Sequence, residues 1–322
     1  MINWGIIGCG DVTEIKSGPA FNKVSGSKLV GVMRRSADKA ADYAKRHNIP
    51  KWYANADELI NDPDINAIYI ATPPSSHQEY AMAAIKAGRS VYVEKPMALN
   101  YAAAKSIAEA AAKEDVKLTV AHYRRQWPLF QKLKELLAQQ TIGDIRLIQL
   151  HLYKQPPTAA QMADEKNAWR INPAIAGGGL FHDLAPHQLD IMYYLFGAAI
   201  NITGMSTNQG KQYVADDIVT GHIHFANGIL FSGAWCFTAP EASDHCEIIG
   251  SIGTINFSFF SGNHLLQTIN GKTTRFDFPL LPHVQQPMIE QTVNYFSGTA
   301  PDPCTGAEGA EIMRWMGEMT KS

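Results

Sequence analysis

Two short segments of the chain carry side chains suited to proton and charge chemistry. The first is Glu94-Lys95-Pro96, and the second runs from Gly177 to His187 and contains Asp183. On a helix, Asp183 and His187 stand at positions i and i+4, so both side chains point to the same side. A histidine titrates near neutral pH, a carboxylate can orient it, and a lysine favours negative charge developing on oxygen. These residues indicate acid–base chemistry on a hydroxyl or carbonyl group.

Each feature also has an ordinary structural explanation. A lysine beside a proline turn is common at a protein surface, and an Asp/His pair on a helix is often only structural. Pro186 removes a helical hydrogen bond unless it lies near the first turn. We expect no metal at His182, Asp183 and His187, because the two histidines are five residues apart and point to different sides of a helix.

A glycine turn lies near the start of the chain, after the apolar run Asn3–Ile7. Its sequence is Gly8-Cys9-Gly10-Asp11-Val12, with Thr13 where a third glycine is common. In a dinucleotide-binding turn, the first glycine permits the bend and the second lets the backbone approach the pyrophosphate. The motif is weak alone and gains specificity from its place between a first strand and a first helix. We therefore predict that residues 8–12 bind a dinucleotide.

The end of the second apolar run bears on the choice of cofactor. NAD-binding chains usually carry an acid about 20 residues on, which bonds the ribose hydroxyls. This chain has Arg34, Arg35 and Ser36 at that point. Two guanidinium groups and a hydroxyl accept a 2′-phosphate that an acid would repel, so we predict NADP(H) in preference to NAD(H). The alternative is a solvated basic start to a helix.

Apolar runs alternate with helix-like stretches over the first 121 residues. The predicted helices are Ser36–His47, His77–Ala87 and Asn100–Glu114. Strands that are apolar throughout and alternate with helices predict a doubly wound, Rossmann-type parallel sheet. The predicted strands are Asn3–Ile7, Leu29–Met33, Ala67–Ala71, Ser90–Val93 and Leu118–Ala121.

Polar residues follow two of these strands. Thr72, Pro73 and His77 come after the strand that ends at Ala71, and Glu94 and Lys95 come after Val93. Open α/β sheets bind their ligands at the carboxyl ends of the strands. We therefore place these five residues at the cofactor, and Lys95 can also donate to the substrate oxygen.

The pattern changes after about residue 121. A predicted helix, Leu129–Gln139, precedes a predicted strand, Ile145–Tyr153, and the part beyond Ile200 is mostly of β type. Strands joined by hairpins predict a mostly antiparallel sheet. The later predicted segments are the strands Ile218–Phe225, Gly228–Phe237, His245–Ile249 and Gly253–Phe259, and the helices Gln285–Phe296 and Ala307–Met319. We predict a dinucleotide-binding domain over residues 1–121 and a mostly antiparallel, open-sheet α+β domain over residues 122–322 that binds substrate and forms oligomer contacts.

Composition limits the kinds of partner. The 322 residues exceed the usual span of one core, and the net charge of −2 gives no global basic field for nucleic acid or an anionic membrane. The four cysteines have no metal-ligand spacing, and no apolar run approaches the roughly 20 residues that a membrane helix needs. The first residues read as a strand rather than a leader, so we expect a soluble, cytoplasmic protein with reduced thiols.

Six markers, taken in order, resemble the glucose-fructose oxidoreductase/inositol dehydrogenase/rhizopine-catabolism (Gfo/Idh/MocA) family over essentially the whole chain. They are Gly8-Cys9-Gly10, Ala71-Thr72-Pro73 with His77, Glu94-Lys95-Pro96, Arg124-Arg125 with Pro128, Trp169-Arg170, and Gly177-Gly178-Gly179 with Asp183 and His187. The resemblance implies that Lys95 is the active-site lysine and precedes a cis peptide bond. It also implies that His187 is the acid/base residue and that Asp183 orients it or binds a substrate hydroxyl.

The same resemblance implies an activity. It is hydride transfer between a nicotinamide cofactor and a hydroxyl- or carbonyl-bearing carbon of a sugar, polyol or related cyclic alcohol. Tyr123, Trp169, Arg170 and Asp183 are the implied substrate contacts, and the C-terminal sheet is implied to form a homodimer or homotetramer. Two alternatives are an NAD-dependent glycoside hydrolase that oxidises its substrate transiently and a cofactor-sensing regulator without turnover. Retention of Lys95, Asp183 and His187 argues against the regulator.

Overall fold

The computed structural model describes residues 1–321, apart from the side chains of residues 165 and 166. The chain forms two compact units. Unit 1 comprises residues 1–123 and 281–313, and unit 2 comprises residues 124–280 and the chain from residue 314 onward. The first division lies close to the predicted boundary after residue 121. The predicted second domain of residues 122–322 differs, however, because residues 281–313 return to unit 1.

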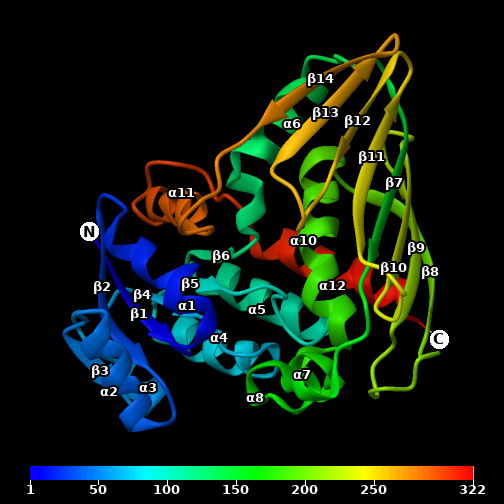
Figure 1. The fold of residues 1–322 in the computed structure, drawn as a ribbon. Coiled ribbons are helices and arrows are strands. Elements are labelled where there is room, and N and C mark those ends of the chain that lie inside the picture. Colours follow the sequence, from blue (N-terminus) through cyan, green and yellow to red (C-terminus); the bar gives the residue numbers. More distant parts are fainter. Residues whose placement is uncertain (322) are drawn as a thin grey trace. The chain divides into compact units, whose positions relative to one another are not determined.

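Unit 1 contains a parallel sheet of six strands in the order β3-β2-β1-β4-β5-β6 (Figure 1). The family-type doubly wound fold predicted for this part of the chain is confirmed. The strands are β1 (Ile2–Ile7), β2 (Ser27–Met33), β3 (Lys51–Tyr53), β4 (Ala67–Ile70), β5 (Ser90–Val93) and β6 (Leu118–Val120). Between them lie α1 (Asp11–Ile15), η1 (Gly18–Asn22), α2 (Ala37–Arg46), α3 (Ala56–Ile60), η2 (Pro74–Ser76), α4 (His77–Lys86) and α5 (Tyr101–Lys113). Of these six strands, only β3 lacks a predicted counterpart, because its three residues are all at least partly exposed.

An aromatic core explains why residues 281–313 belong to unit 1. The Trp4 ring, which is fully buried, lies 4.8 Å from the Phe21 ring and 5.5 Å from the Phe296 ring. Phe296 ends α11 (Gln286–Phe296). Burying such rings removes much apolar surface from water, which holds this late helix against the first strand. A reading along the sequence cannot detect that return.

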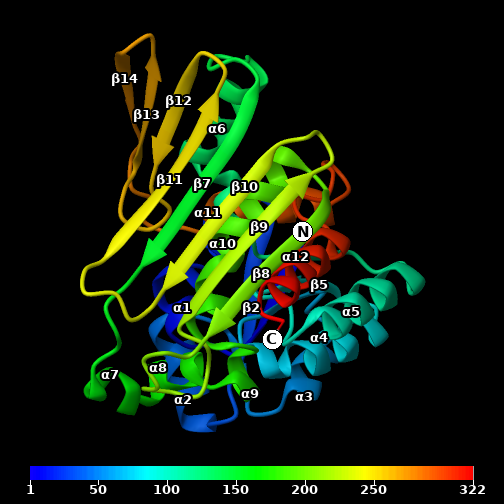
Figure 2. The same ribbon diagram turned by 90° about the vertical axis from the view of Figure 1, so that its right-hand side faces the viewer.

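Unit 2 contains an eight-stranded sheet in the order β14-β13-β12-β11-β7-β10-β9-β8 (Figure 2). Its pairs are antiparallel except β7 with β10, so the prediction of a mostly antiparallel sheet is confirmed. The strands are β7 (Ile145–Tyr153), β8 (Ala199–Thr207), β9 (Ile218–Phe225), β10 (Leu230–Cys236), β11 (Ser243–Gly250), β12 (Gly253–Phe257), β13 (His264–Ile269) and β14 (Lys272–Asp277). The sequence did not predict the bounds of β8, β13 and β14, which carry few buried residues or, in β14, none.

Two helices of unit 2 cover one face of this sheet, as Figure 2 shows for α6 (Pro128–Ala138) and α10 (Gly179–Phe196). The Phe130 ring of α6 lies 6.0 Å from Phe257, and the Phe181 ring of α10 lies 5.0 Å from Trp235. The indole nitrogen of Trp235 also donates to Gln188 at 2.6 Å. These contacts fix α10, which carries Asp183 and His187.

The remaining helices are short, apart from the last one. They are η3 (Tyr123–Gln126), α7 (Ala159–Ala163), α8 (Glu165–Ala168), η4 (Trp169–Ile171), α9 (Pro173–Ala176) and the longer α12 (Gly306–Met319). Among residues 1–321, no helix combines the length and the apolar character needed to span a membrane.

Candidate active site

The glycine turn joins β1 to α1. Gly8 has a φ of +94°, and a Cβ there would lie 2.8 Å from the backbone nitrogen of Thr72. A Cβ at Gly10 would meet nothing nearer than the Gly8 carbonyl oxygen at 3.9 Å. Gly8 is therefore required by the backbone, and the space beside Gly10 is open to a ligand. This cradle fits the pyrophosphate of a dinucleotide.

The other residues of the turn contribute in different ways. The Cys9 side chain is fully buried, and burial raises the pKa of its thiol to about 11. Cys9 therefore offers a ligand only its backbone. Asp11 is exposed and Val12 half-buried at the start of α1.

Thr13 takes a structural place where the common motif has a third glycine. Its side chain is fully buried, and its hydroxyl donates to the Gly10 carbonyl at 2.8 Å. Its own carbonyl accepts a hydrogen bond from the Tyr43 hydroxyl at 2.7 Å. Thr13 thus fixes α1 against α2, so its presence does not disturb the cradle.

The basic residues predicted to select the cofactor lie beside the glycine turn. Ile7 of β1 pairs with Met33 of β2, so the residues after β2 stand next to the turn. A guanidinium nitrogen of Arg34 donates to the Cys9 carbonyl oxygen at 3.3 Å. Arg35 and Ser36 are exposed.

The second group of predicted cofactor residues lies at the same edge of the sheet. Ile7 pairs with Ile70 of β4, and Ile70 pairs with Val93 of β5. The parallel strands therefore bring the residues after Ile7, Ile70 and Val93 together at their carboxyl ends. Lys95, which is half-buried, follows β5, and its peptide bond to Pro96 is cis, as the resemblance implied.

His77 connects the loops that follow β4 and β5. Its ring is fully buried, with Nε2 2.7 Å from the Thr72 carbonyl oxygen and Nδ1 3.0 Å from that of Pro96. Burial lowers the pKa of this histidine. The ring thus lies between the loops of Thr72 and Pro96, and in its neutral form it donates to one of the two carbonyl oxygens. Its predicted contact with the cofactor stays a prediction.

Glu94 braces the backbone of Lys95. Its carboxylate accepts hydrogen bonds from the Tyr69 hydroxyl at 2.6 Å and from the backbone nitrogen of Lys95 at 3.1 Å. A third bond, of 2.5 Å, comes from the amide of Gln285. The predicted contact of Glu94 with the cofactor also stays a prediction. The sequence held no signal for Gln285, which lies 191 positions from Glu94.

Helix α10 presents the predicted acid/base pair. His187 is 6% exposed and Asp183 is partly exposed, at the predicted spacing of four residues. Pro186 lies inside the helix rather than in its first turn. The imidazole of His187 lies 5.8 Å from the ring of Phe260, with an angle of 72° between the ring planes. An edge contact of this kind fixes the imidazole plane.

The predicted substrate residues of unit 2 form one cluster. Nε of Arg170 lies 3.2 Å from Oδ2 of Asp183, and the Arg170 guanidinium lies 4.6 Å from the centre of the Trp169 ring. Asn167, which the sequence did not single out, accepts from Arg170 at 3.0 Å. Tyr123, the fourth predicted contact, is 7% exposed at the end of the first segment of unit 1.

Packing within unit 2 accounts for the three consecutive glycines before α10. Gly177 ends α9 with a φ of +93°. A Cβ on Gly178 would lie 2.1 Å from the ring of His182, and one on Gly179 would lie 2.4 Å from the Ala215 Cβ. Burial lowers the pKa of His182 to about 4, so this histidine is neutral.

The paired arginines of the family resemblance have structural partners. Arg125 forms an ion pair with Asp190 at 2.7 Å, with both side chains almost fully buried. The guanidinium of Arg124 lies 4.2 Å from the centre of the Trp127 ring and 4.7 Å from that of Phe260. Arg124 therefore stacks on Phe260, the residue whose ring contacts His187.

Two family models match the chain. Residues 2–122 match the model described as "Oxidoreductase family, NAD-binding Rossmann fold", and residues 130–256 match "GFO/IDH/MocA C-terminal domain". The protein "Oxidoreductase P35" of Formosa agariphila is 46% identical over 98% of this chain and 97% of its own length. The "1,5-anhydro-D-fructose reductase" of Ensifer adhaerens is 29% identical over 79% of this chain and 75% of its own.

A solved structure has the same fold over nearly the full length. It is titled "Levoglucosan dehydrogenase, complex with NADH and levoglucosan", and it aligns with a TM-score of 0.86. The alignment covers 99% of this chain and 96% of that one at 21% identity. At that identity the likeness concerns the fold.

Proposed function

Since the chain belongs to the Gfo/Idh/MocA family of NAD-binding oxidoreductases, we propose that it oxidises a hydroxyl carbon, or reduces a carbonyl carbon, of a sugar, polyol or related cyclic alcohol. Two relatives are named for anhydrosugars, one a reductase of 1,5-anhydro-D-fructose and one a dehydrogenase of levoglucosan. Their names support a compact ring sugar as the substrate.

The observation that carries this proposal is the place of Lys95. It follows β5 at the sheet edge that also bears the glycine turn, and Glu94 holds its backbone nitrogen. A positive charge there stabilises an alkoxide-like oxygen beside a bound nicotinamide. The nicotinamide, when bound, supplies the site that takes or gives the hydride.

His187 is the proposed acid/base residue that exchanges a proton with the substrate hydroxyl. In the direction of oxidation, Nδ1 or Nε2 of His187 accepts the proton of the substrate hydroxyl while the ammonium of Lys95 stabilises the charge left on the oxygen. In reduction, the same histidine returns the proton.

In the proposed reaction, Asp183 binds the substrate and Arg170 holds Asp183 in place. The ion pair to Arg170 fixes the carboxylate, which then accepts a hydrogen bond from a substrate hydroxyl. Trp169 adds an apolar surface beside them, and Tyr123 completes the proposed set. In this proposal unit 1 binds the cofactor, and unit 2 supplies all the proposed substrate contacts of this set except Tyr123.

NADP(H) is the proposed cofactor in preference to NAD(H). Arg34 is held beside the glycine turn by its bond to the Cys9 carbonyl, and Arg35 and Ser36 are exposed next to it. Guanidinium groups bind phosphate oxygens through paired hydrogen bonds, which favours a cofactor with a 2′-phosphate.

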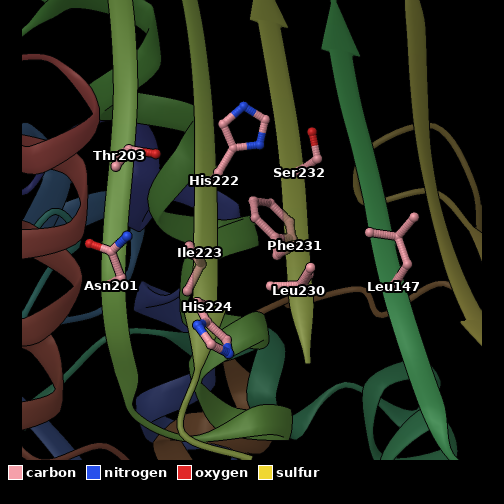
Figure 3. Close-up of a pocket in the computed structure, with 9 residues that line it drawn as sticks. All are labelled: Leu147, Asn201, Thr203, His222, Ile223, His224, Leu230, Phe231 and Ser232. Atoms are coloured by element: carbon pink, nitrogen blue, oxygen red, sulfur yellow. The ribbon is translucent and has the colours of Figure 1, made fainter. Parts of the chain in front are cut away.

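We also propose that the uncovered face of the unit 2 sheet joins copies of the chain into a dimer or tetramer. Figure 3 shows a shallow pocket on this face, crossed by β8, β9, β10 and β7. Its lining residues are Leu147, Asn201, Thr203, His222, Ile223, His224, Leu230, Phe231 and Ser232. Leu230 is 50% exposed, and Met205 on β8 is 74% exposed. Exposed apolar side chains on a sheet face favour the use of that face as a protein–protein interface.

A substrate screen tests the proposed activity. The protein is incubated with NAD or NADP and a panel of pyranosides, anhydrosugars, inositols and open-chain polyols, and the reduced nicotinamide is followed by its near-ultraviolet absorbance. We expect net formation of reduced cofactor with at least one ring alcohol. Hydrolysis of a glycoside without net reduction would instead identify the transient-oxidation hydrolase, and cofactor binding without any turnover would identify the regulator.

A further inference from the structure

Phe260 is an exposed aromatic residue in direct contact with the proposed acid/base histidine. It lies in the loop between β12 and β13, and 38% of it is exposed. Its ring centre is 5.8 Å from that of His187. Among the described residues of unit 2, it is the one aromatic residue in the set of exposed large apolar side chains. A ligand that covered the exposed part of this ring would gain the free energy of burying it.

The loop that carries Phe260 is held in place by one carboxylate. Asp244 of β11 accepts hydrogen bonds from the backbone nitrogens of Phe259 at 3.1 Å, of Phe260 at 2.5 Å and of Ser261 at 2.9 Å. The Ser261 hydroxyl donates to the same carboxylate at 3.2 Å. A charged acceptor that bonds three successive N–H groups fixes their backbone.

A second residue fixes the Phe260 ring itself. The guanidinium of Arg124 lies 4.7 Å from the ring centre of Phe260 and 4.2 Å from that of Trp127, and it donates to the Phe259 carbonyl. Arg124 is only 5% exposed. A planar guanidinium stacks well on aromatic faces, and this one ties the Phe260 ring to unit 2. The ring is thus both exposed and immobilised.

We propose that Phe260 is a stacking platform for the C–H face of a ring-shaped substrate. The axial C–H groups of a pyranose or anhydrosugar carry a small positive charge, which the electron-rich face of a phenyl ring attracts. An open-chain polyol presents no such flat face. An immobile ring beside the acid/base residue therefore selects cyclic substrates and sets which hydroxyl reaches His187. Asp244 and Arg124 are positioning residues for this platform.

This inference rests on the proposed function, and a matched pair of ligands separates the two. The pair is 1,5-anhydro-D-glucitol, which is cyclic, and D-glucitol, its open-chain counterpart. Binding of each to the protein with bound cofactor is measured by saturation-transfer NMR, together with KM and kcat for the best ring and open-chain alcohols of the panel. Phe260→Leu removes the aromatic face, and Phe260→Tyr retains it.

In Phe260→Leu, we expect the dissociation constant and KM of ring alcohols to rise about tenfold, or about 1.4 kcal/mol. For open-chain polyols and for the cofactor, we expect little change. Phe260→Tyr should bind ring alcohols like the wild type, and Asp244→Asn should weaken ring binding because its loop loses a charged acceptor. Equal effects of Phe260→Leu on both ligands, or none on the ring ligand, would overturn the platform. If the wild type binds the ring ligand through Phe260 but turns over no alcohol, the proposed reaction fails and the platform stands.

Discussion

Arg170 holds Asp183: Nε of the arginine lies 3.2 Å from Oδ2 of the aspartate, with both side chains mostly buried. The sequence placed both residues near the substrate but gave no reason to pair them. Because the ion pair joins η4 to α10, Asp183 is already oriented by the protein before any substrate binds. The carboxylate therefore has a fixed direction, and the arginine that fixes it becomes a target for mutation.

Replacing Arg170 by leucine should impair substrate binding more than the chemical step. Asp183 would lose its charged partner, so we expect KM for the substrate to rise about tenfold while kcat falls less. Steady-state kinetics with saturating cofactor measure the change. Arg275→Leu removes an exposed ion pair of the same sheet unit and serves as the control. Equal kinetics in the two variants would contradict the role of Arg170.

The basic residues after β2 predict cofactor preference. Replacing Arg34 and Arg35 by alanine should raise KM for NADP by about ten- to a hundredfold and that for NAD by much less, because only NADP carries the 2′-phosphate. Comparing kcat/KM for the two cofactors measures the effect. Lys39→Ala, an exposed cation on the following helix, should leave the preference unchanged. A loss shared equally by both cofactors would contradict the assignment.

His182 predicts a stability loss in mild acid. Its folded pKa is about 4, below the 6.5 of an ordinary histidine, because burial disfavours the charged form. Below pH 6.5 the unfolded chain binds a proton that the folded chain does not, so the free energy of unfolding falls until the pH reaches about 4. Between pH 6.5 and about 4, we expect the free energy of unfolding of His182→Gln to fall by roughly 1–3 kcal/mol less than that of the wild type. Thermal unfolding at several pH values measures the difference, and His264→Gln, at a partly exposed histidine of β13, should behave as the wild type does.

Much of the fold could be predicted from the sequence because apolar residues recur at the spacing of the buried positions in a strand or helix. The bounds of β7 and β9 agree with prediction to the residue, since their side chains alternate between the buried face and the other face. β3 and β14 were not predicted because none of their residues is buried. The return of α11 to β1 depends on the Trp4–Phe296 contact, which no local pattern contains.

The candidate site was less accessible to sequence reading than the fold. Lys95 and His187 stand in recognisable motifs, but the residues that hold them do not. Gln285 reaches Glu94 from 191 positions away, and Phe260 contacts His187 from a loop that follows β12. Such partners are fixed by tertiary packing, which a single sequence does not record.

Oligomerisation through the uncovered sheet face predicts a charge-sensitive interface. Leu230→Glu should convert the dimer or tetramer to a smaller species, because a buried, unpaired carboxylate is costly. Light scattering coupled to size-exclusion chromatography measures the mass. Val214→Glu adds the same charge at a residue that is 86% exposed but lies outside the strands, and it should leave the mass unchanged. The same mass for wild type and Leu230→Glu would place the interface elsewhere.

The most direct test of the proposed reaction compares turnover with cofactor affinity in Lys95→Met and His187→Asn. Steady-state reduction of the cofactor gives turnover, and fluorescence titration with the reduced cofactor gives affinity. We expect turnover to fall by about 10²–10⁴-fold in each variant, because each removes a group that acts on the reacting oxygen, while the dissociation constant of the cofactor changes little. Turnover near that of the wild type in either variant would contradict the account.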